Sequence, residues 1–176
     1  MDNNEVTQDE ISNLPHGAQA AFAAACPRIA WDGLKRRHWG HPLLYLEGAM
    51  SVVGRFARLP AALPKEKAKF VRTVSDLVAR ADSEPGGQCG SALARSIREA
   101  LSVTLLEPDS AGIQELGAKH ANEAYRWALH ATRIAPLGAA VPAEREFLGQ
   151  VRKALDRLFA SHPMLPAPSQ GQEQLS

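Results

Sequence analysis

Cysteine is scarce in this chain of 176 residues, which holds only Cys26 and Cys89, far apart and in no CxxC pair. That spacing argues against a disulfide framework and against a zinc knuckle. Aromatic residues make up only 6% of the chain, and no window has the roughly eighteen uninterrupted apolar residues that a membrane span needs. The start, MDNNEVTQDE, lacks the basic residues and apolar run of a secretory signal. We therefore expect a cytosolic protein whose cysteines are small buried hydrophobes.

Catalytic signatures are also missing: there is no Gly-rich phosphate loop, no GxSxG, no HExxH and no pair of carboxylates at a useful spacing. Two weak metal candidates remain, His38 with His41 in a turn and His120 with Glu123 on a helix. Zinc needs four ligands, or three and a water, and di-metal bundles use Glu-x-x-His on two helices. Neither set is complete, so we expect no metal, no cofactor and no enzymatic activity.

Runs of Val, Ile and Thr are rare, whereas the good helix formers Ala, Leu, Arg and Glu are abundant. Clusters of Pro and Gly separate six segments whose apolar residues recur at helical spacing. These segments are 15–38, broken or kinked at Pro27, 42–58 with Pro42 at its start, 65–81, 91–106 capped by Ser91, 113–135 and 143–161. Because each is apolar on one side only, the sequence predicts an all-α compact bundle of about six mostly antiparallel helices. We expect one domain over 13–162, with disordered tails at 1–12 and 163–176.

The stretch KRRHWGHP at 35–42 joins the first two predicted helices. Its three cations suit the negative end of a helix dipole, Gly40 can end that helix, and Pro42 can start the next one. Trp39 would then be a wedge between the two helices. This structural interpretation is the one we favour for the stretch.

Charge is distributed unevenly along the chain. Between Arg28 and Arg80 eleven Lys and Arg stand against four Asp and Glu, which leaves +7, whereas the whole chain carries +1. Clustered cations with an aromatic side chain for stacking are typical of nucleic-acid-backbone binding, although a pI near 7.9 is low for that class. Binding to DNA or RNA is therefore the alternative function. The residues assigned to it are Lys35, Arg36, Arg37, Trp39, Arg55, Arg58, Lys65, Lys69 and Arg72.

Association with another protein is the function that we expect first, as a partner-binding regulator or a small subunit of a larger complex. On 113–135 the apolar stripe includes Leu116 and Trp127, and Tyr125 and Leu129 lie across from it. Phe147 lies off the centre of its own stripe. These last three residues are tentative partner-binding residues of an exposed patch. The alternative is that they belong to the core, because central helices of a bundle are apolar on more than one side.

The segment 42–58 has two further features. Glu47 lies beside an apolar face, so it is either paired with a cation such as Arg37 or buried with a raised pKa, and we expect pairing. Four residues of this segment are small enough for another backbone to approach closely: Gly48, Ala49, Ser51 and Gly54. We expect that approach to come from within the bundle rather than from a partner.

Overall fold

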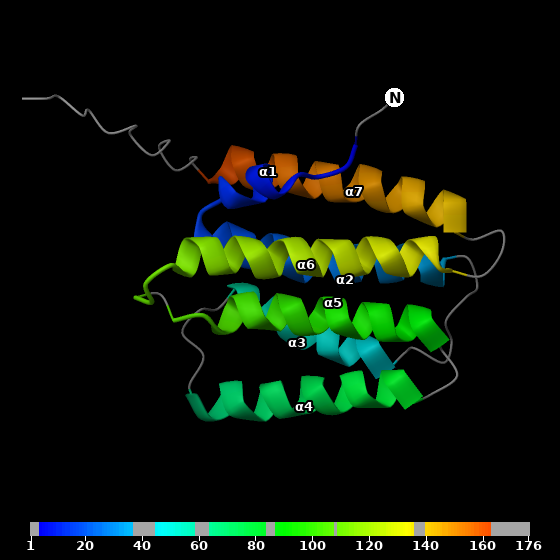
Figure 1. Ribbon diagram of the computed structural model, residues 1–176, viewed down its shortest axis with the longest axis horizontal. Helices are drawn as coiled ribbons and strands as arrows, with labels where there is room; N and C mark the ends of the chain where they lie inside the picture. The colour runs from blue at the N-terminus through cyan, green and yellow to red at the C-terminus, as the bar shows by residue number, and fades with distance from the viewer. Residues whose placement is uncertain are drawn as a thin grey trace, which may run out of the picture.

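A computed structural model describes residues 4–36, 45–58, 64–83, 87–107, 109–135 and 140–162. These residues form seven helices and no strand, which confirms the predicted all-α bundle (Figure 1). The helices are α1 (Gln8–Ser12), α2 (His16–Lys35), α3 (Tyr45–Arg58), α4 (Pro64–Ser83), α5 (Gly87–Leu105), α6 (Ile113–Arg133) and α7 (Ala140–Ser161). Within the described ranges, no helix combines the length and the hydropathy needed to cross a bilayer.

Helix α2 is the centre of the bundle, since it packs against α3, α5, α6 and α7. In Figure 1, α7 and α1 lie above the α2–α6 pair, α5 and α3 lie below it, and α4 forms the lower edge. Helix α2 runs through Pro27, so the expected break there is wrong. An interior proline costs a helix about 3 kcal/mol, and packing on four neighbouring helices offsets that cost here.

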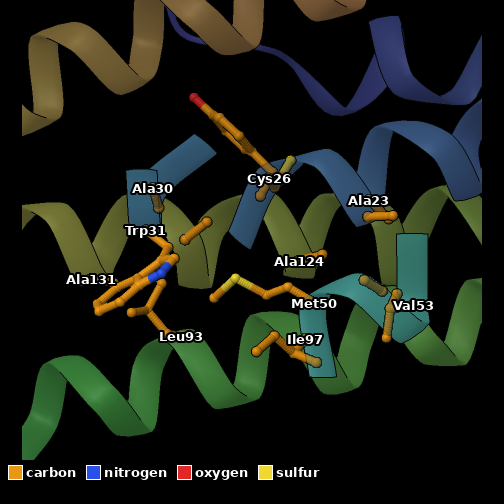
Figure 2. Packing of buried hydrophobic residues seen from close by; sticks show 14 of the residues in the cluster. Ala23, Cys26, Ala30, Trp31, Met50, Val53, Leu93, Ile97, Ala124 and Ala131 are labelled. Atoms are coloured by element: carbon orange, nitrogen blue, oxygen red, sulfur yellow. The ribbon is translucent and has the colours of Figure 1, made fainter. Parts of the chain in front are cut away.

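Small side chains are frequent on the buried faces of α2 and α6. Ala23 and Ala30 of α2 and Ala124 and Ala131 of α6 are fully buried. Residues of this size let helix axes approach closely, and larger side chains such as Trp31 fill the remaining spaces (Figure 2). The alanine content of the sequence therefore supplies the core as well as helix propensity.

Helix α5 begins at Gly87, four residues before the predicted start. Gly87 has φ +54°, a left-handed conformation that glycine adopts without strain. Ser91 lies inside the helix, and its hydroxyl donates a hydrogen bond to the carboxylate of Asp82 at the end of α4. The prediction that Ser91 caps the helix is therefore wrong. Pro42, the predicted first residue of another helix, lies outside the described residues.

The N-terminal segment is part of the fold, so the expectation of a disordered tail is wrong for residues 4–12. Thr7 and Glu10 form a capping box for α1, in which Thr7 Oγ1 accepts from Glu10 N at 3.3 Å and Thr7 N donates to Glu10 Oε2 at 2.9 Å. Ile11 and Leu14 are fully buried. Residues 1–3 and the predicted tail at 163–176 lie outside the described ranges.

Candidate functional site

The expected exposed patch of Tyr125, Leu129 and Phe147 is wrong, because these side chains are only 3%, 5% and 1% exposed. The ring of Tyr125 stacks on Phe147 with 5.9 Å between centroids, and its hydroxyl accepts a 3.2 Å hydrogen bond from Val6 N. The N-terminal segment thus covers this side of α6. Of the stripe predicted to face the core, Trp127 is only partly buried and Leu116 is 43% exposed.

The histidine candidates give no metal site in the described part of the chain. His120 Nδ1 lies 2.7 Å from Glu99 Oε2, whereas Glu123 accepts from Arg126 at 3.1 Å, so the two candidate ligands do not converge. The described residues contain no group of three or more His, Cys, Asp or Glu that could hold a metal ion. His38 and His41 lie outside them.

Several cations of the predicted basic face are neutralised by acids from elsewhere in the chain. Arg36 pairs with Glu146 of α7, and Lys67 Nζ lies 3.5 Å from Glu107 Oε1. Charge counted along residues 28–80 therefore overstates the charge of the surface. Of the remaining residues assigned to nucleic-acid binding, Arg37 and Trp39 lie outside the described residues, as does the side chain of Lys65, whereas Lys69 and Arg72 are exposed on α4.

Glu47 is paired, as expected, with groups of α2. Its Oε1 accepts hydrogen bonds from Lys35 Nζ at 2.6 Å and from Trp31 Nε1 at 2.8 Å. The hydrogen bond from Lys35, and then that from Trp31, hold the pKa of Glu47 below its usual value. The partner that we named from the sequence, Arg37, lies outside the described residues.

Three other arginines meet at a groove of about 430 Å³ between α2 and α3, which lie behind α5 and α6 in Figure 1. Arg28 comes from α2, and Arg55 and Arg58 come from the last turns of α3. Arg28 Nη2 donates to the neutral hydroxyl of Ser51 at 3.0 Å. No carboxylate from the described residues lines this groove. The rest of its lining, apart from Ser51, is small or apolar: Ala21, Ala24, Ala25, Met50, Gly54 and Ala57.

Two glycines of α3 have open space above them. Among the described residues, a Cβ at Gly48 would meet no atom within 4 Å, and one at Gly54 would meet only Arg58 Nη2 at 4.0 Å, the helix's own nearby backbone aside. The expected close approach from within the bundle is therefore wrong for both. It is right for Ala49, which is buried at 2% exposure. Since Gly54 lines the groove, the open space there is available to a partner.

A second depression, of about 540 Å³, lies over α6 beside the N-terminal segment. Its cations are already engaged, because Arg126 pairs with Glu123, and Arg133 pairs with Glu5 at 2.7 Å and with Glu144 at 2.8 Å. These bonds raise the pKa of Arg133, and the bond with Glu144 has the larger effect. The α2–α3 groove, which has three arginines and no described carboxylate in its lining, is the stronger candidate site.

Comparisons with family models, with curated proteins and with solved structures gave no match for this chain. What the groove can bind follows from its own residues. Arg55 and Arg58 were among the binding residues predicted from the sequence. The α2 residues that line the same groove were not. The spacing of Ala21, Ala25 and Arg28 could have indicated the α2 side of the groove, because it places these residues on one helical face.

Proposed function

We propose that this protein is a non-enzymatic binding protein, a regulator or a small subunit, and that its α2–α3 groove holds an anionic segment of a partner. One observation carries the proposal: Arg28, Arg55 and Arg58 face a concave, largely apolar surface that has no described carboxylate in its lining. Guanidinium groups bind carboxylates and phosphates through paired hydrogen bonds. An anion bound here would gain these bonds without displacing an acid of the groove.

The apolar lining adds to what such a segment can gain. Ala21 and Ala25 are half-buried in the free protein, so a partner that covers them removes further apolar surface from water. A surface that combines cations with apolar groups resembles protein interfaces in composition. Arg28 is partly ordered by its bond to Ser51, which lowers the entropy lost when it binds.

A second candidate function is binding to a nucleic-acid backbone. Arg55, Arg58, Lys69 and Arg72 are all exposed, and their side chains have no carboxylate partner among the described residues. Exposed Lys and Arg side chains neutralise phosphates and release counterions. Affinity would then fall steeply with salt, whereas an apolar protein contact would change little.

The experiment that tests the proposal is site-specific photo-crosslinking in the cells that make the protein. A photoreactive residue replaces Ala25 in the groove, and a matched control replaces Leu116, which is exposed on α6 outside it. We expect a discrete adduct from position 25 that disappears in an Arg55→Glu, Arg58→Glu variant. Protease sensitivity of the adduct identifies a protein partner, and nuclease sensitivity identifies the second candidate.

Three results would contradict the proposal: no adduct from position 25, the same adduct from position 116, or an adduct that survives the double charge reversal. Circular dichroism of each variant shows whether the helical fold is kept, so that loss of the adduct reports on the groove.

A further inference from the structure

We infer that the occupant of the α2–α3 groove is an amphipathic helix of a partner protein, with small apolar residues on its buried face and acidic residues along its flanks. This inference rests on the proposed function of the groove and names the chemistry of the partner. It follows from the floor of the groove, from the helices that form it and from its charge.

The floor favours a protein over a phosphate backbone. Ala21, Ala25 and Ala57 of the lining offer no side-chain hydrogen-bond partner. A sugar–phosphate chain laid on this floor would lose water from its polar groups without replacement. An apolar helix face would gain by being removed from water in the same place.

The walls favour a helix over an extended strand. Both walls are α-helices, whose backbone groups are bonded within each helix, so a strand would find no ladder partner and would leave its own amides unsatisfied. A helix satisfies its backbone internally and presents only side chains. Gly54 of α3 and Ala25 of α2, which both line the groove, have little or no side chain, so the axis of a third helix can come close.

The charge of the groove requires acids on the incoming helix and argues against a symmetric pair of this chain. A second copy docked by the same face would bring Arg28, Arg55 and Arg58 against the same three cations. The acidic helix α1 of the chain itself is held elsewhere, because its Glu10 accepts hydrogen bonds from Arg152 of α7. The structure therefore points to a different protein as the source of the helix.

The test uses a synthetic fluorescent peptide of about five helical turns, with Ala and Leu on one face and Glu along both flanks. Two matched peptides are measured beside it, one with Lys in place of each Glu and one with a central Pro that breaks the helix. Fluorescence anisotropy gives Kd for the full-length protein and for an Arg55→Gln, Arg58→Gln variant. An Arg145→Gln, Arg157→Gln variant removes the same charge from exposed positions on α7 and is the control.

We expect the acidic helical peptide to bind, with Kd about tenfold weaker in the groove variant and within about twofold of wild type in the control variant. The Lys and Pro peptides should bind at least about tenfold more weakly. Equal binding of the Lys or Pro peptide would overturn the inference, as would no binding of the acidic peptide at concentrations up to about 1 mM.

A parallel arm separates failure of the inference from failure of the proposed function. Labelled single- and double-stranded oligonucleotides are titrated against the same variants. If they bind through Arg55 and Arg58 while the acidic peptide does not, the helical occupant is wrong and the anion-binding groove stands. If neither probe binds and position 25 gives no adduct in cells, both are wrong.

Discussion

Gly117 of α6 lies directly against Gln19 of α2, so closely that a Cβ at position 117 would overlap Oε1 of that side chain. The same Cβ would lie 2.9 Å from Nδ1 of His16. Gln19 is fully buried, and its Nε2 donates to the carbonyls of Ile11 at 3.4 Å and Gln114 at 3.2 Å. A side chain at position 117 would therefore force the buried amide of Gln19 to move.

Gly117→Ala should destabilise the protein by about 1–3 kcal/mol, because the methyl group displaces Gln19 from its two hydrogen bonds. Urea denaturation followed by circular dichroism measures the free energy of unfolding. A gain in stability would show that Gln19 moves aside without cost, and would contradict this account of the contact.

In α3, the same change from glycine to alanine should raise the free energy of unfolding. Gly48→Ala and Gly54→Ala each add a methyl group into open space, so we expect each to raise the free energy of unfolding by about 0.5–1 kcal/mol through helix propensity. The measurement is the same urea titration. A loss of stability at Gly54 would mean that its surroundings are more crowded than the contact distances show.

The attachment of the N-terminal segment should depend on pH. Hydrogen bonds from Arg152 hold the pKa of Glu10 below its usual value of 4.5. The unfolded chain then binds this proton at higher pH than the folded one, so the contribution to stability is present above about pH 5 and is lost as pH falls through the folded pKa. Glu10→Gln keeps an acceptor for the capping box but removes the titrating group.

We therefore expect the free energy of unfolding to fall less in Glu10→Gln than in wild type between about pH 6 and pH 3, by up to about 1 kcal/mol for a partly exposed pair. Glu47 also has a lowered pKa, so part of the wild-type dependence should persist. An equal fall in the free energy of unfolding in both proteins would show that the Glu10–Arg152 pair does not contribute to the pH dependence.

Both cysteines should be protected from thiol reagents in the folded protein. Burial raises the pKa of Cys89 to about 12 and also raises that of Cys26. Their thiols donate to the carbonyls of Ala131 and Phe22, each at 3.2 Å. We expect labelling, followed by mass spectrometry, to be at least about a thousandfold slower in the folded protein than in urea. Rapid labelling of Cys89 would contradict the burial of the α5–α6 contact.

The helices could be predicted from the sequence because their apolar periodicity is local, but the bundle's contacts could not. Helix α1 was missed although the stretch Thr7–Glu10 carries a capping-box pattern, because the surrounding residues are polar. The burial of Tyr125 depends on where the N-terminal segment lies, which periodicity within α6 does not encode.

The candidate site was predictable only in its chemistry. The excess of cations at 28–80 is a property of the sequence, yet Glu146 and Glu107 neutralise part of it from helices far along the chain. What remains unneutralised in the groove depends on how α2 packs on α3. The small size of Gly54 is visible in the sequence, whereas the open space above it is a property of the fold.

Whether the α2–α3 groove is the binding surface is tested by Gly54→Leu, measured for folding and for crosslinking together. The new side chain enters the groove from a position where, among the described residues, its Cβ meets only the tip of Arg58. We expect an unfolding free energy within about 1 kcal/mol of wild type and loss of most of the adduct formed from position 25. An unchanged yield of that adduct in a folded Gly54→Leu protein would contradict this expectation.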